Sequence, residues 1–251
     1  MIMNRQTILI TGASSGLGLG MALEYAKQGK HLALCARRME NLESLKVKIE
    51  SSYPNAKVSI KSLDVNDHDA VFRVFKEFKS EMGSLDRVIV NAGMGKGASI
   101  GKGFHHANVA TAQTNFVAAV VQAEAALEIF REQNAGHLVT ISSFSALRGF
   151  PGALTVYAAT KAALTTFSEG LRVDLRGSPI RVSCIHPGFI RSEINEKVKN
   201  MPFLVDLETG CKSMVKAIDK EKPNSFVPRW PWEFLKWGIR IAPLSVLAKM
   251  G

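Results

Sequence analysis

A tyrosine and a lysine four residues apart are the first candidates for chemistry in this chain. Tyr157 and Lys161 lie in an Ala- and Leu-rich stretch without Gly or Pro, which predicts a helix. Residues at this spacing share a helix face, and a cation beside a phenol favours the phenolate and moves the tyrosine pKa toward neutrality. The pair is a candidate acid/base, although a ring packed under a lysine stem has the same spacing and no chemistry.

The elements that must position this pair alternate between short β-branched runs and longer helical patterns. The alternation predicts a single α/β domain, a doubly wound parallel sheet with helices on both faces. Ligands of such sheets bind outside the carboxyl ends of the strands, so residues just past each strand are the candidate site. The predicted strands are 7–11, 31–36, 57–62, 86–91, 136–142, 180–185 and 225–227, and the predicted helices are 17–28, 39–51, 67–82, 112–133, 155–176 and 208–220.

Composition and charge narrow the class of protein. The 251 residues, 46% of them hydrophobic, suit one domain with a full core. The net charge of +10 is spread along the chain and interrupted by acids, so nucleic-acid binding is not expected. An anionic cofactor or an anionic membrane surface suits the same charge. The first predicted strand begins at residue 7, which leaves no room for a secretion signal and favours the cytoplasm.

Cysteine and histidine spacing predicts no metal site. Cys35 and Cys184 lie in apolar strand-like runs, as core thiols in a reducing compartment do. His105 and His106 are adjacent and cannot present the i, i+4 geometry of a helical metal pair. We therefore expect chemistry that needs no metal.

A glycine-rich loop, TGASSGLG from residue 11 to residue 18, connects the first predicted strand to a helix. Glycines let the backbone turn sharply and approach a pyrophosphate, which the amides at the helix N-terminus then bind. The cofactor-binding residues predicted here are Gly12, Ser14, Ser15, Gly16, Leu17 and Gly18.

Several short motifs occur in one order along the chain, and together they resemble the classical short-chain dehydrogenases/reductases. The resemblance covers residues 5–195 and implies a Rossmann-type fold and hydride transfer with a nicotinamide dinucleotide. It rests on the Gly-x-x-x-Gly-x-Gly loop, Asn91-Ala92-Gly93, Asn115, Ser143, Tyr157-x-x-x-Lys161 and Pro187-Gly188.

The end of the second predicted strand indicates which dinucleotide is bound. A protein that binds NAD places an acid there for the ribose 2′-hydroxyl, whereas this chain has Ala36, Arg37 and Arg38. Guanidinium groups grip phosphate oxygens bidentately, so the two arginines favour the 2′-phosphate of NADP(H).

Other roles follow only from the resemblance. It implies that Asp64 and Val65 contact the adenine and that Asn91, Ala92 and Gly93 line the ribose side. A turn after the sixth strand is expected to hold the nicotinamide through Pro187, Gly188, Ile190 and Ser192, where serine replaces the usual threonine.

The resemblance also implies a catalytic set, Asn115, Ser143, Tyr157 and Lys161. Ser143 would hydrogen-bond the substrate carbonyl, and Tyr157 would donate its proton to it. Lys161 would keep the pKa of Tyr157 low and hold the nicotinamide ribose. Asn115 would position a water that leads protons to Lys161, whereas the residues alone allow an exposed or helix-kinking asparagine there.

Residues 229–251 lie outside these motifs and follow a dehydrogenase domain predicted to span residues 1–228. The segment has an amphipathic helical pattern interrupted at Pro243, with Trp230, Phe234, Trp237 and Ile241 on one side. The sequence leaves open a lid over the substrate pocket, a subunit contact and a membrane contact. An apolar segment beside the active site favours a lipophilic substrate.

The sequence thus predicts an NADPH-dependent oxidoreductase that reduces a ketone or aldehyde to an alcohol. We expect a cytoplasmic homodimer or homotetramer, with peripheral membrane association through residues 229–251 left open. The alternative is a dinucleotide-binding scaffold or redox sensor with little turnover. Residues 94–110 and 193–215 should shape the substrate pocket but carry no motif that identifies the substrate.

Overall fold

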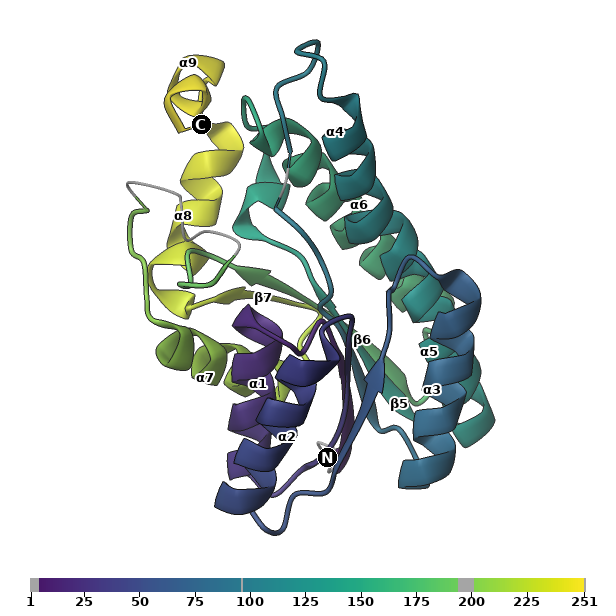
Figure 1. Ribbon diagram of the computed structural model, residues 1–251. Helices are drawn as coiled ribbons and strands as arrows, with labels where there is room; N and C mark the ends of the chain where they lie inside the picture. Colours follow the sequence, from purple (N-terminus) through teal and green to yellow (C-terminus); the bar gives the residue numbers. More distant parts are fainter. Residues whose placement is uncertain (1–4, 96, 194–200, 251) are drawn as a thin grey trace.

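A seven-stranded parallel sheet forms the centre of the computed structural model, which describes residues 5–95, 97–193 and 201–250 (Figure 1). Its strand order is β3-β2-β1-β4-β5-β6-β7. All the strand pairings are parallel. The strands are β1 Thr7–Thr11, β2 His31–Ala36, β3 Val58–Ser62, β4 Arg87–Val90, β5 Gly136–Ile141, β6 Ile180–Pro187 and β7 Asn224–Val227.

Helices cover both faces of the sheet, which confirms the predicted doubly wound Rossmann-type architecture. Figure 1 shows α1, α2 and α7 on one face and α3, α5 and α6 on the other. The helices are α1 Gly16–Lys27, α2 Met39–Ser52, α3 His68–Met82, α4 His105–Ala112, α5 Ala118–Gln133, α6 Leu154–Asp174, α7 Leu207–Ile218, α8 Arg229–Ile241 and α9 Leu244–Leu247. Short helical turns are η1 Gln113–Val117, η2 Phe144–Leu147 and η4 Ala248–Met250.

Side-chain alternation along the strands produces two hydrophobic cores. In β1, Ile8 and Ile10 pack with residues of α1, α2 and α7, whereas Leu9 packs with residues of α3, α5 and α6. All three side chains are fully buried. Successive strand residues point to opposite faces, so strands covered on both faces are apolar throughout.

The chain reverses its direction across the sheet between β1 and β4. It passes from β1 to β2 and β3 at one edge, then returns to place β4 on the other side of β1. The crevice at such a switch point, outside the carboxyl ends of the strands, is the usual ligand site of open α/β sheets.

The helix before β5 begins earlier than the sequence pattern predicts. We expected it at residue 112, but α4 starts at His105 and continues through η1, a π-helical turn, into α5. The buried residues of α4 are the polar Asn108 and Thr111. Apolar periodicity is absent there because α4 is held by polar contacts, including the bond from the amide of Ala98 to Oδ1 of Asn108 at 2.9 Å.

The C-terminal helix α8 attaches to the domain through a few buried residues. Trp232 is 3% exposed and packs with Phe144 and Phe226, and Leu247 of α9 is buried beside Phe150. Nη1 of Arg148 donates to the carbonyl oxygens of residues 239, 240 and 242 at the end of α8. Among the helices that the structure describes, none has the length and apolar character needed to cross a bilayer.

Candidate active site

A cleft of about 690 Å³ opens at the carboxyl ends of the strands, at the switch point between β1 and β4. Its volume is within the range of small-molecule and cofactor sites. Most residues predicted from the sequence line it: Gly12, Ser14, Ser15, Gly16, Leu17, Arg37, Arg38, Asp64, Val65, Asn91, Ala92, Gly93, Ser143, Tyr157, Lys161, Pro187, Gly188, Ile190 and Ser192. The two that do not, Gly18 and Asn115, pack directly behind its wall.

The glycine loop packs so tightly against the end of β4 that side chains would not fit. Gly12 has a φ of +65°, and a Cβ there would lie 2.9 Å from Cα of Ala92. A Cβ on Gly18 would collide with the carbonyl of Gly12. Asn91 fastens the two segments, because its Nδ2 donates to the carbonyl of Thr11 at 2.9 Å. A bare backbone loop leading into the N-terminus of α1 fits a pyrophosphate.

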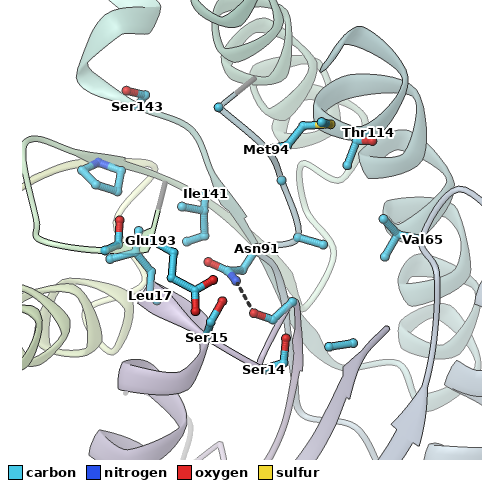
Figure 2. Close-up of a pocket in the computed structure, with 18 of the residues that line it drawn as sticks. Ser14, Ser15, Leu17, Val65, Asn91, Met94, Thr114, Ile141, Ser143 and Glu193 are labelled. Atoms are coloured by element: carbon cyan, nitrogen blue, oxygen red, sulfur yellow. Dashed lines mark hydrogen bonds between the residues drawn. The ribbon is translucent and has the colours of Figure 1, made fainter. Parts of the chain in front are cut away.

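Charged groups from two separate segments meet at the outer end of the cleft. Nη2 of Arg38 donates to Oγ of Ser15 and to Oε2 of Glu193, the latter at 3.0 Å. Figure 2 shows Glu193 reaching toward Ser15 on the glycine loop. The guanidinium of Arg38 lowers the pKa of Glu193, which keeps this carboxyl ionised. Arg37 lines the same end of the cleft and is exposed.

The segment after β3 lines the cleft beside the π-helical turn η1. Oδ1 of Asp64 accepts from the amide and from Nδ2 of Asn66, both at 3.0 Å. Asn66 in turn contacts Oγ1 of Thr114 at 3.3 Å. Val65 is buried against this wall at 7% exposure. The segment therefore offers an apolar surface with polar atoms at its rim.

Ser143, Tyr157 and Lys161 come together at the inner end of the cleft. Ser143 follows β5 and caps η2, its Oγ accepting from the amide and the hydroxyl of Ser145 at 3.2 and 2.9 Å. Tyr157 and Lys161 lie on successive turns of α6, as their spacing predicts. Nζ of Lys161 is 5.8 Å from the centroid of the Tyr157 ring and donates to the carbonyl of Ile141 at 2.8 Å.

Burial sets the protonation of this group. Desolvation raises the pKa of Tyr157, and an interaction with the Ser143 hydroxyl opposes the rise. The Lys161 ammonium donates to a backbone carbonyl, so its expected effect on the pKa of Tyr157 stays a prediction for the site with bound cofactor. Burial lowers the pKa of Lys161 to about 8, opposed by the nearby Cys184 thiol.

Asn115 lies in the π-helical turn η1 and is 1% exposed. Its Oδ1 accepts from the amide of Met94 at 2.8 Å and its Nδ2 donates to the carbonyl of Met94 at 2.9 Å. The side chain therefore replaces a backbone partner for the segment after β4. It also borders Lys161 across Gly93, since a Cβ on Gly93 would lie 3.2 Å from Oδ1 of Asn115 and 3.6 Å from Nζ of Lys161.

The turn after β6 is supported from behind by the C-terminal segment. The indole of Trp232 lies against Gly188 so closely that a Cβ at residue 188 would collide with it. The same ring contacts Phe144, next to Ser143, with centroids 4.5 Å apart. Residues 229–249 contribute no side chain to the cleft lining, so in the described chain α8 acts on the site through these contacts.

Several lining residues were not named individually from the sequence. Asn66 and Thr114 line the cleft beside predicted residues, and Met94 and Glu193 begin the ranges 94–110 and 193–215 that were expected to shape the substrate pocket. The rule that site residues follow strand ends would have included Met94. Thr114 and Glu193 come from a helical turn and from the segment after β6, and no local signal directs their side chains into the cleft. Among the described residues, no cluster of three or more His, Cys, Asp or Glu forms a candidate metal site.

Known proteins with related sequences align to most of this chain. The sequence profile described as short chain dehydrogenase matches residues 6–202. An uncharacterized oxidoreductase of Mycobacterium tuberculosis is 50% identical over 228 residues, which cover 91% of this chain and 90% of that protein. The 11-beta-hydroxysteroid dehydrogenase 1A of Arabidopsis thaliana is 32% identical over a 267-residue alignment, covering 94% of this chain and 75% of that protein.

A solved structure gives the same result for the fold. The short chain dehydrogenase/reductase from Burkholderia phymatum in complex with NAD has a TM-score of 0.84 against this chain, at 20% identity. The match covers 96% of this chain and 94% of that one. At this identity the likeness supports the fold and does not extend to the cofactor.

Proposed function

The chain belongs to the short-chain dehydrogenase family of oxidoreductases, which use nicotinamide dinucleotides, and from that premise we propose that it reduces a lipophilic ketone or aldehyde with NADPH. The observation that carries the proposal is the meeting of Ser143, Tyr157 and Lys161 at the inner end of the cleft, opposite the arginines at its outer end.

NADPH is favoured over NADH by the residues at the end of β2. Ala36, Arg37 and Arg38 line the cleft where an acid would accept the 2′-hydroxyl of NADH. The guanidinium of Arg38 is already held toward the glycine loop by Ser15. Two cations at this point would bind the 2′-phosphate. When bound, the cofactor supplies the hydride that reaches the carbonyl carbon.

Ser143 and Tyr157 act on the carbonyl oxygen. Oγ of Ser143 accepts hydrogen bonds from Ser145, which leaves its own proton to be donated to the substrate. The raised pKa keeps the proton on Tyr157 at neutral pH, as reduction requires. Tyr157 passes this proton to the carbonyl oxygen as negative charge develops there, and the product is the neutral alcohol.

Lys161 and Asn115 support this proton donor. The Lys161 ammonium, close to the ring of Tyr157, stabilises the phenolate that remains after proton transfer. Asn115 fixes the backbone beside Lys161 through Met94, and we expect it to position a water that returns a proton toward Lys161. Neither step requires a metal.

A lipophilic substrate is favoured by the apolar residues that pack behind the inner end of the cleft. Leu147, Phe189 and Ile239 are partly buried around Phe144 and Trp232, just behind Ser143. The Arabidopsis relative is named a hydroxysteroid dehydrogenase, which agrees with an extended apolar alcohol or ketone. Assembly into a dimer or tetramer through the long helices is part of the same proposal. Val173 of α6 is exposed, as is Val117 directly before α5.

The test is the oxidation of NADPH with a panel of small and lipophilic carbonyl compounds. The Tyr157→Phe variant should lose at least a hundredfold in rate, because only the proton donor is removed. Tyr53→Phe is the matched control, since Tyr53 lies at the end of α2 away from the cleft. Tight NADPH binding without Tyr157-dependent turnover on any compound would favour a dinucleotide-binding scaffold or sensor instead.

A further inference from the structure

The C-terminal segment carries a row of large apolar side chains that face solvent. Trp230, Phe234, Trp237 and Ile241 of α8 are 72%, 60%, 63% and 84% exposed, and Leu244 of α9 is 76% exposed. We call these five residues the tail surface. Single exposed apolar residues are common, but a contiguous row of this size marks an interaction site.

The tail surface cannot turn inward while α8 keeps its present contacts. The opposite side of α8 is anchored by Trp232, which packs on Gly188 and Phe144. Arg148 holds the end of the helix through three carbonyl groups. The row therefore points away from the cleft, and the lid that the sequence left open would require α8 to detach.

The charges around the tail surface indicate the chemistry of its partner. Residues 229–251 contain four basic residues, Arg229, Lys236, Arg240 and Lys249, against one acid, Glu233. Lys236 and Arg240 lie over the Trp237 ring, 5.5 and 5.6 Å from its centroid. Glu233 is paired with Lys236, so Arg229, Arg240 and Lys249 are the exposed charges of the segment.

A second copy of the chain would bring the same positive charge to the contact, within a protein of net charge +10. An anionic lipid surface instead pairs phosphate groups with the basic side chains and accepts tryptophans at headgroup depth. The helix of 13 residues is long enough to lie in such an interface. The basic side chains that flank the aromatic ones favour an anionic lipid surface over a second copy of the chain as the partner.

We propose that the tail surface docks on the headgroup region of an anionic phospholipid bilayer, with α8 parallel to the membrane plane. Trp230, Phe234 and Trp237 enter the interface, and Arg229 and Arg240 contact lipid phosphates. This inference rests on α8 and its charges and holds whether or not the protein is a reductase.

The test is co-sedimentation of the full chain with phosphatidylcholine vesicles and with vesicles that also contain phosphatidylglycerol. We expect binding to the anionic vesicles, weakened by salt, and at least tenfold weaker binding after Trp230→Ser, Phe234→Ser and Trp237→Ser together. Arg229→Gln with Arg240→Gln should reduce binding to the anionic vesicles by about tenfold or more. The matched control is Val47→Ser, because Val47 is an exposed apolar residue on α2, away from the tail surface.

A second readout uses the unmodified protein and does not depend on the folding of variants. Two of its three tryptophans are exposed on the tail surface, so anionic vesicles should shift their emission to shorter wavelength and brominated lipids should quench it. Absence of vesicle binding by the unmodified chain overturns the proposal, as does a triple variant that binds as well as the unmodified chain. A dimer that the triple serine variant dissociates, without vesicle binding, would assign the surface to a second copy instead.

Discussion

Oε2 of Glu193 lies 3.0 Å from Nη2 of Arg38, and this ion pair joins the segment after β6 to the segment after β2 across the cleft. Both side chains are about half exposed, so the pair adds little to folding stability. Its importance is positional. The carboxylate occupies the side of Arg38 that faces Ser15, where we propose that the cofactor phosphates bind.

Glu193→Gln should therefore tighten NADPH binding several-fold while NADH binding changes less. A neutral amide removes both the competitor for Arg38 and the repulsion of a 2′-phosphate. Fluorescence titration of the two nucleotides measures this directly. The control is Glu208→Gln, because Glu208 is an exposed acid that pairs with Lys27 outside the cleft. Weaker NADPH binding by the Glu193 variant would mean that the ion pair holds the cleft closed over the cofactor.

Replacing Arg37 and Arg38 together by Ala should lower the preference for NADPH over NADH by about a hundredfold or more. Charge-assisted contacts to phosphate are worth roughly 1.5–3 kcal/mol each, and both would be lost. The ratio of kcat/KM with the two nucleotides is the measurement. Arg73→Ala on α3, where the side chain is 68% exposed, is the control. An unchanged ratio would overturn the assignment of NADPH.

The kcat/KM for carbonyl reduction should fall as the pH rises above about 8. The free protein carries a Lys161 whose pKa is lowered by burial to about 8, so its positive charge is lost above that value. A neutral Lys161 no longer stabilises the phenolate of Tyr157. A pH–rate profile of the unmodified protein measures the effect, and a profile that stays flat to pH 10 would contradict it.

The lowered pKa of Lys161 also means that this residue reduces the free energy of unfolding at neutral pH. Its pKa falls from 10.5 when unfolded to about 8 when folded, so the unfolded chain binds more protons between these values and stability rises with pH across that window. At pH 7, Lys161→Met should therefore raise the free energy of unfolding by about 1–2 kcal/mol, after the loss of the bond to Ile141 is subtracted, and should raise the unfolding temperature. The advantage should shrink near pH 10.5, and a variant less stable at pH 7 would argue that the ammonium supports the fold.

Asn115→Leu should destabilise the protein by about 2–4 kcal/mol, because it leaves the partly buried amide and carbonyl of Met94 without their partner. Denaturant unfolding measures this cost. Thr114→Val is the control one residue away, since Thr114 makes only a rim contact with Asn66. Equal stability of the two variants would show that Met94 finds other partners, and Asn115 would then act only in proton transfer.

Much of the architecture was predictable because the spacing of apolar residues along the sequence reflects which side chains are buried. Most residues of the inner strands are buried on both faces, and the predicted set of strands matches the observed one within two residues at either end. The helix α4 was missed because Asn108 and Thr111, its buried side chains, carry no apolar signal. The π-helical turn around Asn115 was likewise unpredictable, because it depends on a bond to Met94, 21 residues away.

By itself the sequence determined the family, the strand-end positions of the candidate site, and the residue types able to bind a dinucleotide and transfer a proton. These three features depend on residue types and spacings within short stretches of the chain, and short motifs are sufficient to identify them. Only the tertiary structure decided that burial raises the pKa of Tyr157, that Glu193 meets Arg38, and that Trp232 anchors a helix whose apolar row faces solvent. Each of these depends on the distance and exposure of groups far apart in the chain, which packing alone sets.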